Sequence, residues 1–291
     1  MQKGLGVYHP IVSFSYFLVV IGSAMLYNHP IFAFISIVSA TIYSYSLDKE
    51  KTKNILLFTT LMAIAITLAN VAFVNRGVTV IFYFRTNPVT LESLYYGIMS
   101  GTLMASVIIW FSNYNEIVTS DKFLYIFSKV LPSIALMVNM TLRLIPKLIQ
   151  QIKIIADTQK TIGLDYSEGS ISHRIKSSMR ILSILVTWAL EDSVHTADSM
   201  KARGYGIKKR SNFSIYNFVK RDFVVFMAIT IIGMFLLMGY INGYSEFLFY
   251  PTIQKLNDDN LSKALYLSYL GISLLPTILS IMEEHKWKYL K

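Results

Sequence analysis

Six stretches of the sequence are apolar over close to the length that a membrane-spanning helix requires. A helix needs about 20 mostly apolar residues to cross the hydrocarbon core of a bilayer. The stretches lie at Ile11–Tyr27, Ile31–Leu47, Ile55–Val74, Leu91–Phe111, Phe223–Ile241 and Ala264–Met282. Only Asn28-His29-Pro30 separates the first two, which indicates a tight helical hairpin. The pattern predicts an all-α polytopic membrane protein with about six transmembrane helices.

The sequence between the fourth and fifth stretches has a different pattern. Charged residues recur every few positions from Asn113 to Asp222, while apolar residues persist at helical spacing. We expect two long amphipathic helices, at about 123–163 and 173–201, joined by a polar linker. Pro132 and Pro146 should kink or divide the first helix, because proline lacks a backbone donor. Gly163 follows the first helix, and Gly204 or Gly206 can end the second.

This alternation divides the chain into three regions. Residues 1–112 hold four spans, residues 113–222 form the region of amphipathic helices, and residues 223–291 hold two spans and a tail.

The distribution of charge predicts an orientation. Only 15% of the residues are charged, against about a quarter in soluble proteins. The net charge is nevertheless +10, and sixteen of the 27 lysines and arginines lie between positions 113 and 222. Lysine and arginine gather in cytoplasmic segments of membrane proteins, so the bilayer rather than nucleic acid accounts for the basic balance. We expect the amphipathic region, the Asp48–Asn54 connection and both termini to be cytoplasmic, with Asn75–Thr90 and Asn242–Lys263 outside.

Several kinds of chemistry find no support in the sequence. It has no cysteine, no GxxxxGK[ST] phosphate-binding loop and no HExxH pair. Its five histidines are widely separated, and the Asp258-Asp259 pair is more typical of a solvated turn than of a metal site. We therefore predict no catalytic residue, no metal ligand and no cofactor. Two alternatives stay open at this point: a membrane enzyme acting on a lipid or isoprenoid, and a stand-alone carrier.

Three ordered segments carry a resemblance to a known family. Asn87-Pro88-Val89-Thr90-Leu91-Glu92 precedes a central span, and Leu142-Arg143-Leu144-Ile145-Pro146-Lys147-Leu148 lies in the first amphipathic helix. The second amphipathic helix ends in Ala197-Asp198-Ser199-Met200-Lys201-Ala202-Arg203-Gly204-Tyr205-Gly206. Together these segments resemble the transmembrane T component of energy-coupling factor importers.

The resemblance implies a docking motif at the end of each amphipathic helix, which the family uses as coupling helices. The second motif is intact at Ala202, Arg203 and Gly204. The first falls at Lys160, Thr161, Ile162 and Gly163, where Ile162 stands in place of the expected arginine. Lys160 could supply the charge, but a lysine lacks the bidentate fork of a guanidinium.

The resemblance also implies a function and partners. A T component is a scaffold in a bacterial cell membrane that binds two cytoplasmic ABC-type ATPases and a small membrane-embedded S component. The S component binds a vitamin or a transition-metal ion, and ATP-driven movement of the coupling helices reorients it. In this chain the candidate contacts to the S component follow one face of the second amphipathic helix: Ile175, Met179, Leu182 and Leu185.

Overall fold

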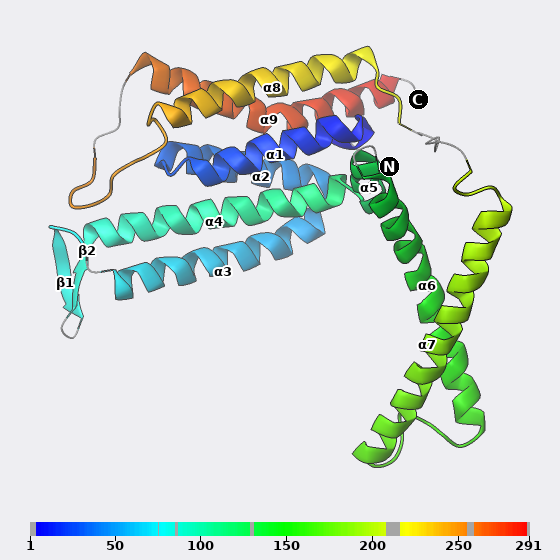
Figure 1. Ribbon diagram of the computed structural model, residues 1–291. Helices are drawn as coiled ribbons and strands as arrows, with labels where there is room; N and C mark the ends of the chain where they lie inside the picture. The colour runs from blue at the N-terminus through cyan, green and yellow to red at the C-terminus, as the bar shows by residue number, and fades with distance from the viewer. Residues whose placement is uncertain are drawn as a thin grey trace. The chain divides into compact units, whose positions relative to one another are not determined.

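The computed structural model describes residues 4–74, 76–84, 87–128, 131–207, 216–254 and 259–289. It divides into two compact units, Met1–Phe123 with Tyr216–Lys291, and Leu124–Ile215. The long helices of the first unit lie side by side (Figure 1): α1 (Pro10–Leu26), α2 (Pro30–Leu47), α3 (Lys49–Phe73), α4 (Leu91–Ile117), α8 (Lys220–Ile241) and α9 (Asn260–Tyr289). Its shorter elements are the 3-10 helix η1 (Gly4–Val7) and the strands β1 (Val80–Phe84) and β2 (Asn87–Thr90). Helix α5 (Ser120–Ser128) leads into the second unit, which holds α6 (Pro132–Thr161) and α7 (Ile171–Ala202).

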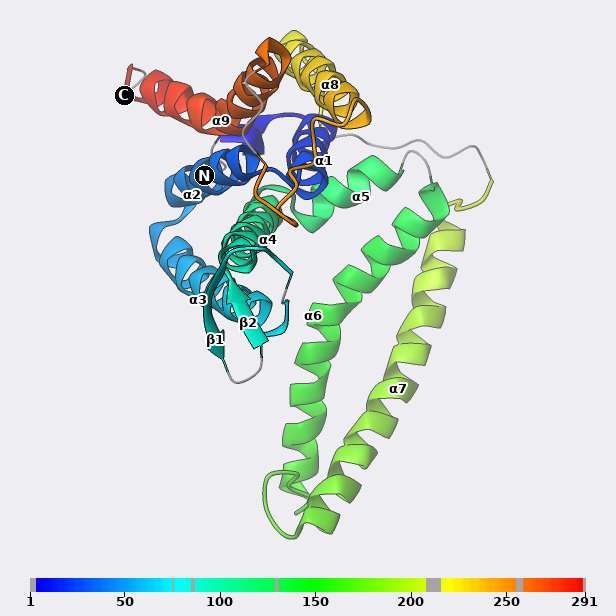
Figure 2. The ribbon, with the colours of Figure 1, turned by 90° about the vertical axis from the view of Figure 1, so that its left-hand side faces the viewer.

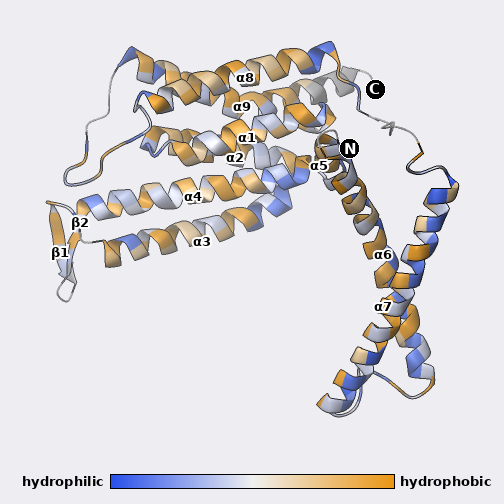
Figure 3. Cartoon of the chain, viewed as in Figure 1, coloured by the Kyte–Doolittle hydropathy of each residue, from blue (hydrophilic) through white to orange (hydrophobic). Residues whose placement is uncertain are grey.

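Six helices of the described residues are long and apolar enough to cross a membrane, judged by length and composition. Five of them, α2, α3, α4, α8 and α9, coincide with predicted spans, and their middle parts are mostly hydrophobic (Figure 3). The sixth is α6, which the sequence assigned to the amphipathic region; it is the least apolar of the six. Helix α1, the remaining predicted span, is apolar but has only 17 residues. The all-α polytopic fold is confirmed, and the places of α1 and α6 relative to the bilayer stay predictions.

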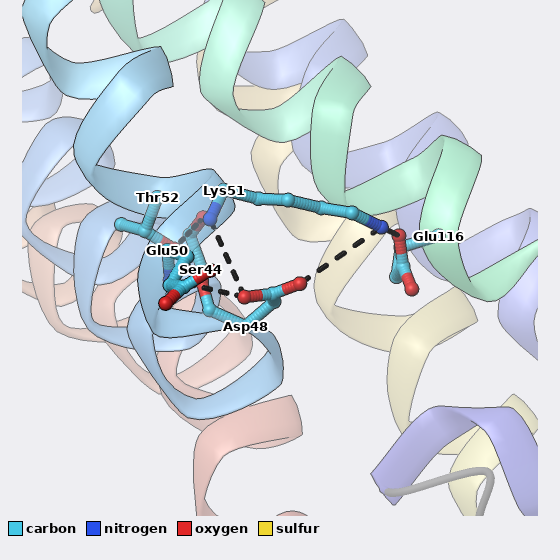
Figure 4. A network of polar contacts seen from close by, with 6 residues as sticks. All are labelled: Ser44, Asp48, Glu50, Lys51, Thr52 and Glu116. Atoms are coloured by element: carbon cyan, nitrogen blue, oxygen red, sulfur yellow. Dashed lines mark hydrogen bonds and ion pairs between the residues drawn. The ribbon is translucent and has the colours of Figure 1, made fainter.

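The connection predicted at Asp48–Asn54 is wrong in length, because α3 begins at Lys49. The Asp48 carboxylate accepts backbone hydrogen bonds from Glu50 and Lys51 at 3.0 and 3.3 Å. The Lys51 ammonium lies 2.9 Å from the Glu116 carboxylate near the end of α4 (Figure 4). An N-cap carboxylate satisfies amide groups that have no partner within their helix. This cap makes the residues that follow Asp48 helical.

The hairpin of α1 and α2 uses the same start signal twice. The pairs His9-Pro10 and His29-Pro30 each place a proline first in a helix, where its missing amide hydrogen is not needed. The Nδ1 atom of His29 accepts a hydrogen bond from the amide of Ile31 at 3.3 Å, and its Nε2 lies 3.2 Å from the Tyr266 hydroxyl of α9. Burial lowers the pKa of His29 to about 4, so the ring is neutral and can cap the helix.

The core of the helical bundle is centred on an aromatic cluster. Trp110 of α4 is fully buried, and its indole N–H donates to the Ser36 hydroxyl of α2 at 3.1 Å. The rings of Tyr16 and Phe17 in α1 meet the indole edge-on, and the ring of Tyr43 in α2 lies tilted against it. These contacts join three helices at one residue.

Helices α3 and α4 approach each other through small residues. Gly97 and Gly101 lie one turn apart on α4, and a Cβ at Gly101 would come within 2.8 Å of the Ala63 carbonyl oxygen. A Cβ at Gly97 would lie 3.1 Å from backbone atoms of Thr67. Small residues at this spacing allow two helix backbones to pack closely within a membrane.

The segment predicted as an outer loop, Asn75–Thr90, contains an unpredicted β-hairpin. Strands β1 and β2 pair antiparallel, from Val80 opposite Thr90 onward. The buried carboxylate of Glu92, in the first turn of α4, accepts hydrogen bonds from the Thr79 amide at 3.2 Å and the Thr79 hydroxyl at 2.6 Å. A negative charge at a helix N-terminus is favourable, so Glu92 stabilises both the turn and α4.

Candidate functional site

Helices α6 and α7 form an antiparallel hairpin with a small shared core (Figure 2). Ile155 and Ala156 of α6 are buried against Ile181 of α7. Lys147 of α6 pairs with the Asp192 carboxylate of α7. These contacts hold the two helices together while most of their apolar side chains lie elsewhere.

Apolar side chains cover the outside of the hairpin to an extent that is unusual for a surface in water. Large exposed residues on the two helices include Ile134, Met137, Leu142, Ile145, Ile149, Ile152, Ile175, Met179, Leu182, Val186, Leu190 and Val194. Many large apolar side chains exposed on one pair of helices mark contact with protein or membrane. Three of the four predicted S-component contacts, Ile175, Met179 and Leu182, belong to this surface. Leu185 instead packs partly buried against the shared core.

Helices α6 and α7 end in the same backbone motif. At the end of α6 the amide of Gly163 bonds to the Lys160 carbonyl at 3.0 Å, and the amide of Leu164 bonds to the Gln159 carbonyl at 3.0 Å. Gly163 has a φ of +79°. This pair of bonds with a left-handed glycine is a Schellman cap.

The end of α7 repeats this pattern. The amide of Gly204 bonds to the Lys201 carbonyl at 2.9 Å, and the amide of Tyr205 bonds to the Met200 carbonyl at 3.0 Å. Gly204 has a φ of +84°, and Gly206, the other candidate stop, also has a positive φ. The expected glycine stops of both helices are therefore present.

The shared motif makes Ile162 and Arg203 geometrically equivalent. Each is the C-cap residue directly before the left-handed glycine, with φ and ψ of −98° and 17° at Ile162 and −82° and 5° at Arg203. Lys160 is equivalent to Lys201, two positions before the C-cap. The first motif therefore has the same lysine as the second motif. It has an isoleucine, Ile162, where the second motif has Arg203.

The two helix ends differ in charge. The Lys160 ammonium lies 3.1 Å from the Asp165 carboxylate, which raises the pKa of Lys160. Asp165 also accepts hydrogen bonds from the amide and hydroxyl of Ser167. Together with the Lys160 ammonium, these bonds lower the pKa of Asp165 to about 2. Arg203 is exposed, and no acidic side chain of the described residues pairs with it. One end offers a free guanidinium, and the other offers Ile162, whose side chain is 65% exposed.

Other candidate chemistry lies outside this hairpin or outside the described residues. Asp258, one half of the acidic pair, and the basic run at 208–210 both fall outside the described residues. Within the described part of the chain, no group of three or more His, Cys, Asp and Glu side chains could hold a metal ion. His29 acts as a helix cap.

Sequence reasoning placed both motifs but missed their backbone equivalence. The signal was present, because Lys-x-x-Gly occurs at 160–163 and at 201–204. It could be recognised by aligning the two glycine stops instead of searching for arginine.

The apolar helices and the exposed hairpin define a multi-pass α-helical membrane protein. The pattern of the CbiQ family, described as a cobalt transport protein, matches residues 8–215, and the chain belongs to this family. It is similar to the energy-coupling factor transporter transmembrane protein EcfT of Streptococcus equi subsp. equi, with 31% identity over 104 residues, 35% of this chain and 39% of that protein. The protein of the same name from Staphylococcus aureus is 29% identical over 197 residues, 65% of this chain and 71% of that protein.

These relationships settle the class of the protein. The matched segment spans about two fifths of the length of the first two relatives. The chain is a transmembrane component of an energy-coupling factor transporter in a bacterial membrane, a transport subunit rather than an enzyme. The resemblance stated from the sequence is confirmed.

Proposed function

We propose that the chain is the scaffold that couples two ABC-type ATPase subunits to a small membrane-embedded S component. The α6–α7 hairpin lies on the cytoplasmic side in this proposal, together with both termini. The high share of lysine and arginine between positions 113 and 222 supports this orientation. ATP-driven movement of the ATPases moves the hairpin, which reorients the S component and releases a vitamin or a transition-metal ion inside.

The length of α7 supports two separate ATPase contacts. At 1.5 Å per residue, its 32 residues span about 48 Å. The end of α6 lies beside the start of α7, across the short turn, and Arg203 lies at the far end of α7. Docking points at this separation fit two protein subunits.

Arg203 is the residue that we assign to one of these contacts. Its exposed guanidinium, which pairs with no acidic side chain in the part of the chain that the structure describes, carries the proposal. A guanidinium matches the geometry of a carboxylate with two parallel hydrogen bonds. Truncating one partner of such a pair in a buried interface costs roughly 2–5 kcal/mol. The helix dipole also favours a cation at this position.

The exposed face of α7 is the surface that we assign to the S component. Ile175, Met179 and Leu182 lie on one face and are exposed. Leu185 supports this face from the α6 side. An apolar surface without fixed polar contacts allows a membrane protein to slide or tilt over it.

Co-purification from the native host, with a tag on this chain and a mild detergent, tests the scaffold role. We expect wild type to recover two ATPase copies and a small hydrophobic protein, and Arg203→Glu to lose one of the two ATPase copies. Lys176→Glu is the matched control, because Lys176 is also an exposed base on α7, far from its end. A wild-type chain that purifies alone and stably would contradict the proposal and favour a stand-alone carrier.

A further inference from the structure

We propose that the α6 end docks to its ATPase through an apolar contact centred on Ile162 and rimmed by carboxylates, rather than through a cation. This inference rests on the proposed function, because it gives the chemistry of the partner surface at one of the two docking points. Its consequence is that the two ATPase surfaces that receive the hairpin are not equivalent.

The turn between α6 and α7 exposes large apolar side chains. Ile162, Tyr166 and Ile171 are 65%, 49% and 77% exposed, respectively. Ile162 and Tyr166 lie in the segment that connects the two helices, and Ile171 is the first residue of α7. This end of the hairpin will be referred to as the apolar tip.

The backbone of the apolar tip is held in place by its own hydrogen bonds. The Schellman cap fixes Ile162, and the Asp165 carboxylate closes the turn through Ser167. The Arg174 guanidinium donates to the Tyr166 carbonyl at 3.2 Å. A preorganised surface loses less conformational entropy on binding, so a small apolar contact here can contribute to affinity.

The charge of the apolar tip selects its partner. Three carboxylates, those of Asp165, Glu168 and Asp157, lie close enough to the Lys160 ammonium to raise its pKa. The amine is paired with Asp165 at 3.1 Å and is therefore engaged within the turn. With the Arg174 guanidinium that also bonds within the turn, residues 157–174 carry three carboxylates and two cations. This balance suits an apolar groove with a neutral or basic rim better than an acidic one.

The complementary partner surface is an apolar groove with a neutral or basic rim. This is the opposite of the acidic groove that fits Arg203, although the two C-cap positions have the same backbone geometry. The apolar tip and the Arg203 end therefore specify two different docking surfaces. A second copy of this chain and the bilayer are the other possible occupants, and both are distinguished below.

The experiment compares variants of the full complex, purified through a tag on this chain, with ATPase copies counted per chain by mass spectrometry. We expect Ile162→Asp to lose one of the two ATPase copies. Lys160→Gln should retain both, because the amine is already engaged by Asp165. Ile154→Asp, which places the same charge on an exposed apolar position of α6 about two turns before its end, is the matched control and should also retain both.

A second measurement keeps the inference falsifiable if Ile162→Asp is poorly folded. In Arg203→Glu, the remaining ATPase copy should stay bound at about 1 M salt, where the Debye length is about 3 Å, because an apolar contact is not screened.

Each contrary result has a distinct meaning. Loss of an ATPase copy in Lys160→Gln but not in Ile162→Asp would overturn the apolar contact and leave the scaffold role intact. Full ATPase retention in Ile162→Asp, with loss of self-association or of liposome binding, would assign the tip to a second copy or to lipid and overturn the inference. If neither Ile162→Asp nor Arg203→Glu changes ATPase recovery, the proposed function itself fails.

Discussion

A neutral histidine and a free arginine show how single residues in this chain depend on their surroundings. His29 is held neutral by burial and caps α2 through Nδ1. Arg203 keeps its charge exposed at a helix end, where the equivalent position of α6 holds Ile162. The cap at His29 was not predicted from the sequence, because it follows from the backbone position and burial of that residue. The docking role of Arg203 stays a prediction.

His29 predicts a dependence of stability on pH. Its pKa is about 4 in the folded chain, against 6.5 ordinarily, so the unfolded chain binds the proton more readily. The contribution of the neutral cap is complete above about pH 6.5 and is lost as the pH falls towards 4. Thermal unfolding of the detergent-solubilised protein should therefore show a lower midpoint at pH 5 than at pH 7.

The variant His29→Asn separates this contribution from those of other titrating groups. Asparagine caps a helix without titrating in this range. We expect the difference in melting temperature between pH 7 and pH 5 to be smaller in His29→Asn than in wild type. An unchanged difference would show that protonation of His29 does not govern this part of the curve.

At the scale of elements, the sequence predicted what depends on composition and missed what depends on pairing. Five of the predicted spans coincide with candidate membrane helices, because about 20 apolar residues have few alternatives to a helix in a bilayer. The β1–β2 hairpin was missed because its strands are stabilised by each other and by Glu92. The start of α3 was missed because it depends on a cap at Asp48.

The close contact of α3 and α4 predicts a specific sensitivity. Gly101→Leu would push its side chain into the Ala63 backbone, and rigid backbone cannot move aside. We expect this variant to lower the melting temperature by several degrees and to reduce the yield of monodisperse protein. Gly271→Leu in α9 is the control, because no heavy atom lies within 4 Å of a Cβ at that position. Equal effects of the two substitutions would refute a role for the small-residue contact.

At the scale of the whole molecule, the chain forms two compact units with different surfaces. The first unit holds the apolar bundle, and the second holds a hairpin that buries little of its own apolar surface. The ends of α6 and α7 could be predicted, because Gly163 and Gly204 mark them. Their chemistry could not, because the engagement of Lys160 by Asp165 depends on how the turn folds.

The central claim is that both ends of the hairpin contact ATPases on the cytoplasmic side. The chain has no cysteine, so a single introduced thiol is the only one available for cross-linking. Thr161→Cys and Ala202→Cys place that thiol directly before each C-cap residue, at exposed positions. Thr187→Cys, exposed near the middle of α7, is the control.

The decisive measurement is cross-linking of these variants in inside-out membrane vesicles from the native host, with and without ATP. We predict that Thr161→Cys and Ala202→Cys each cross-link to an ATPase subunit, with yields that change when ATP is added, and that Thr187→Cys does not. Cross-links to no ATPase, or thiols that a membrane-impermeant maleimide reaches only from the outer face of intact cells, would contradict the account.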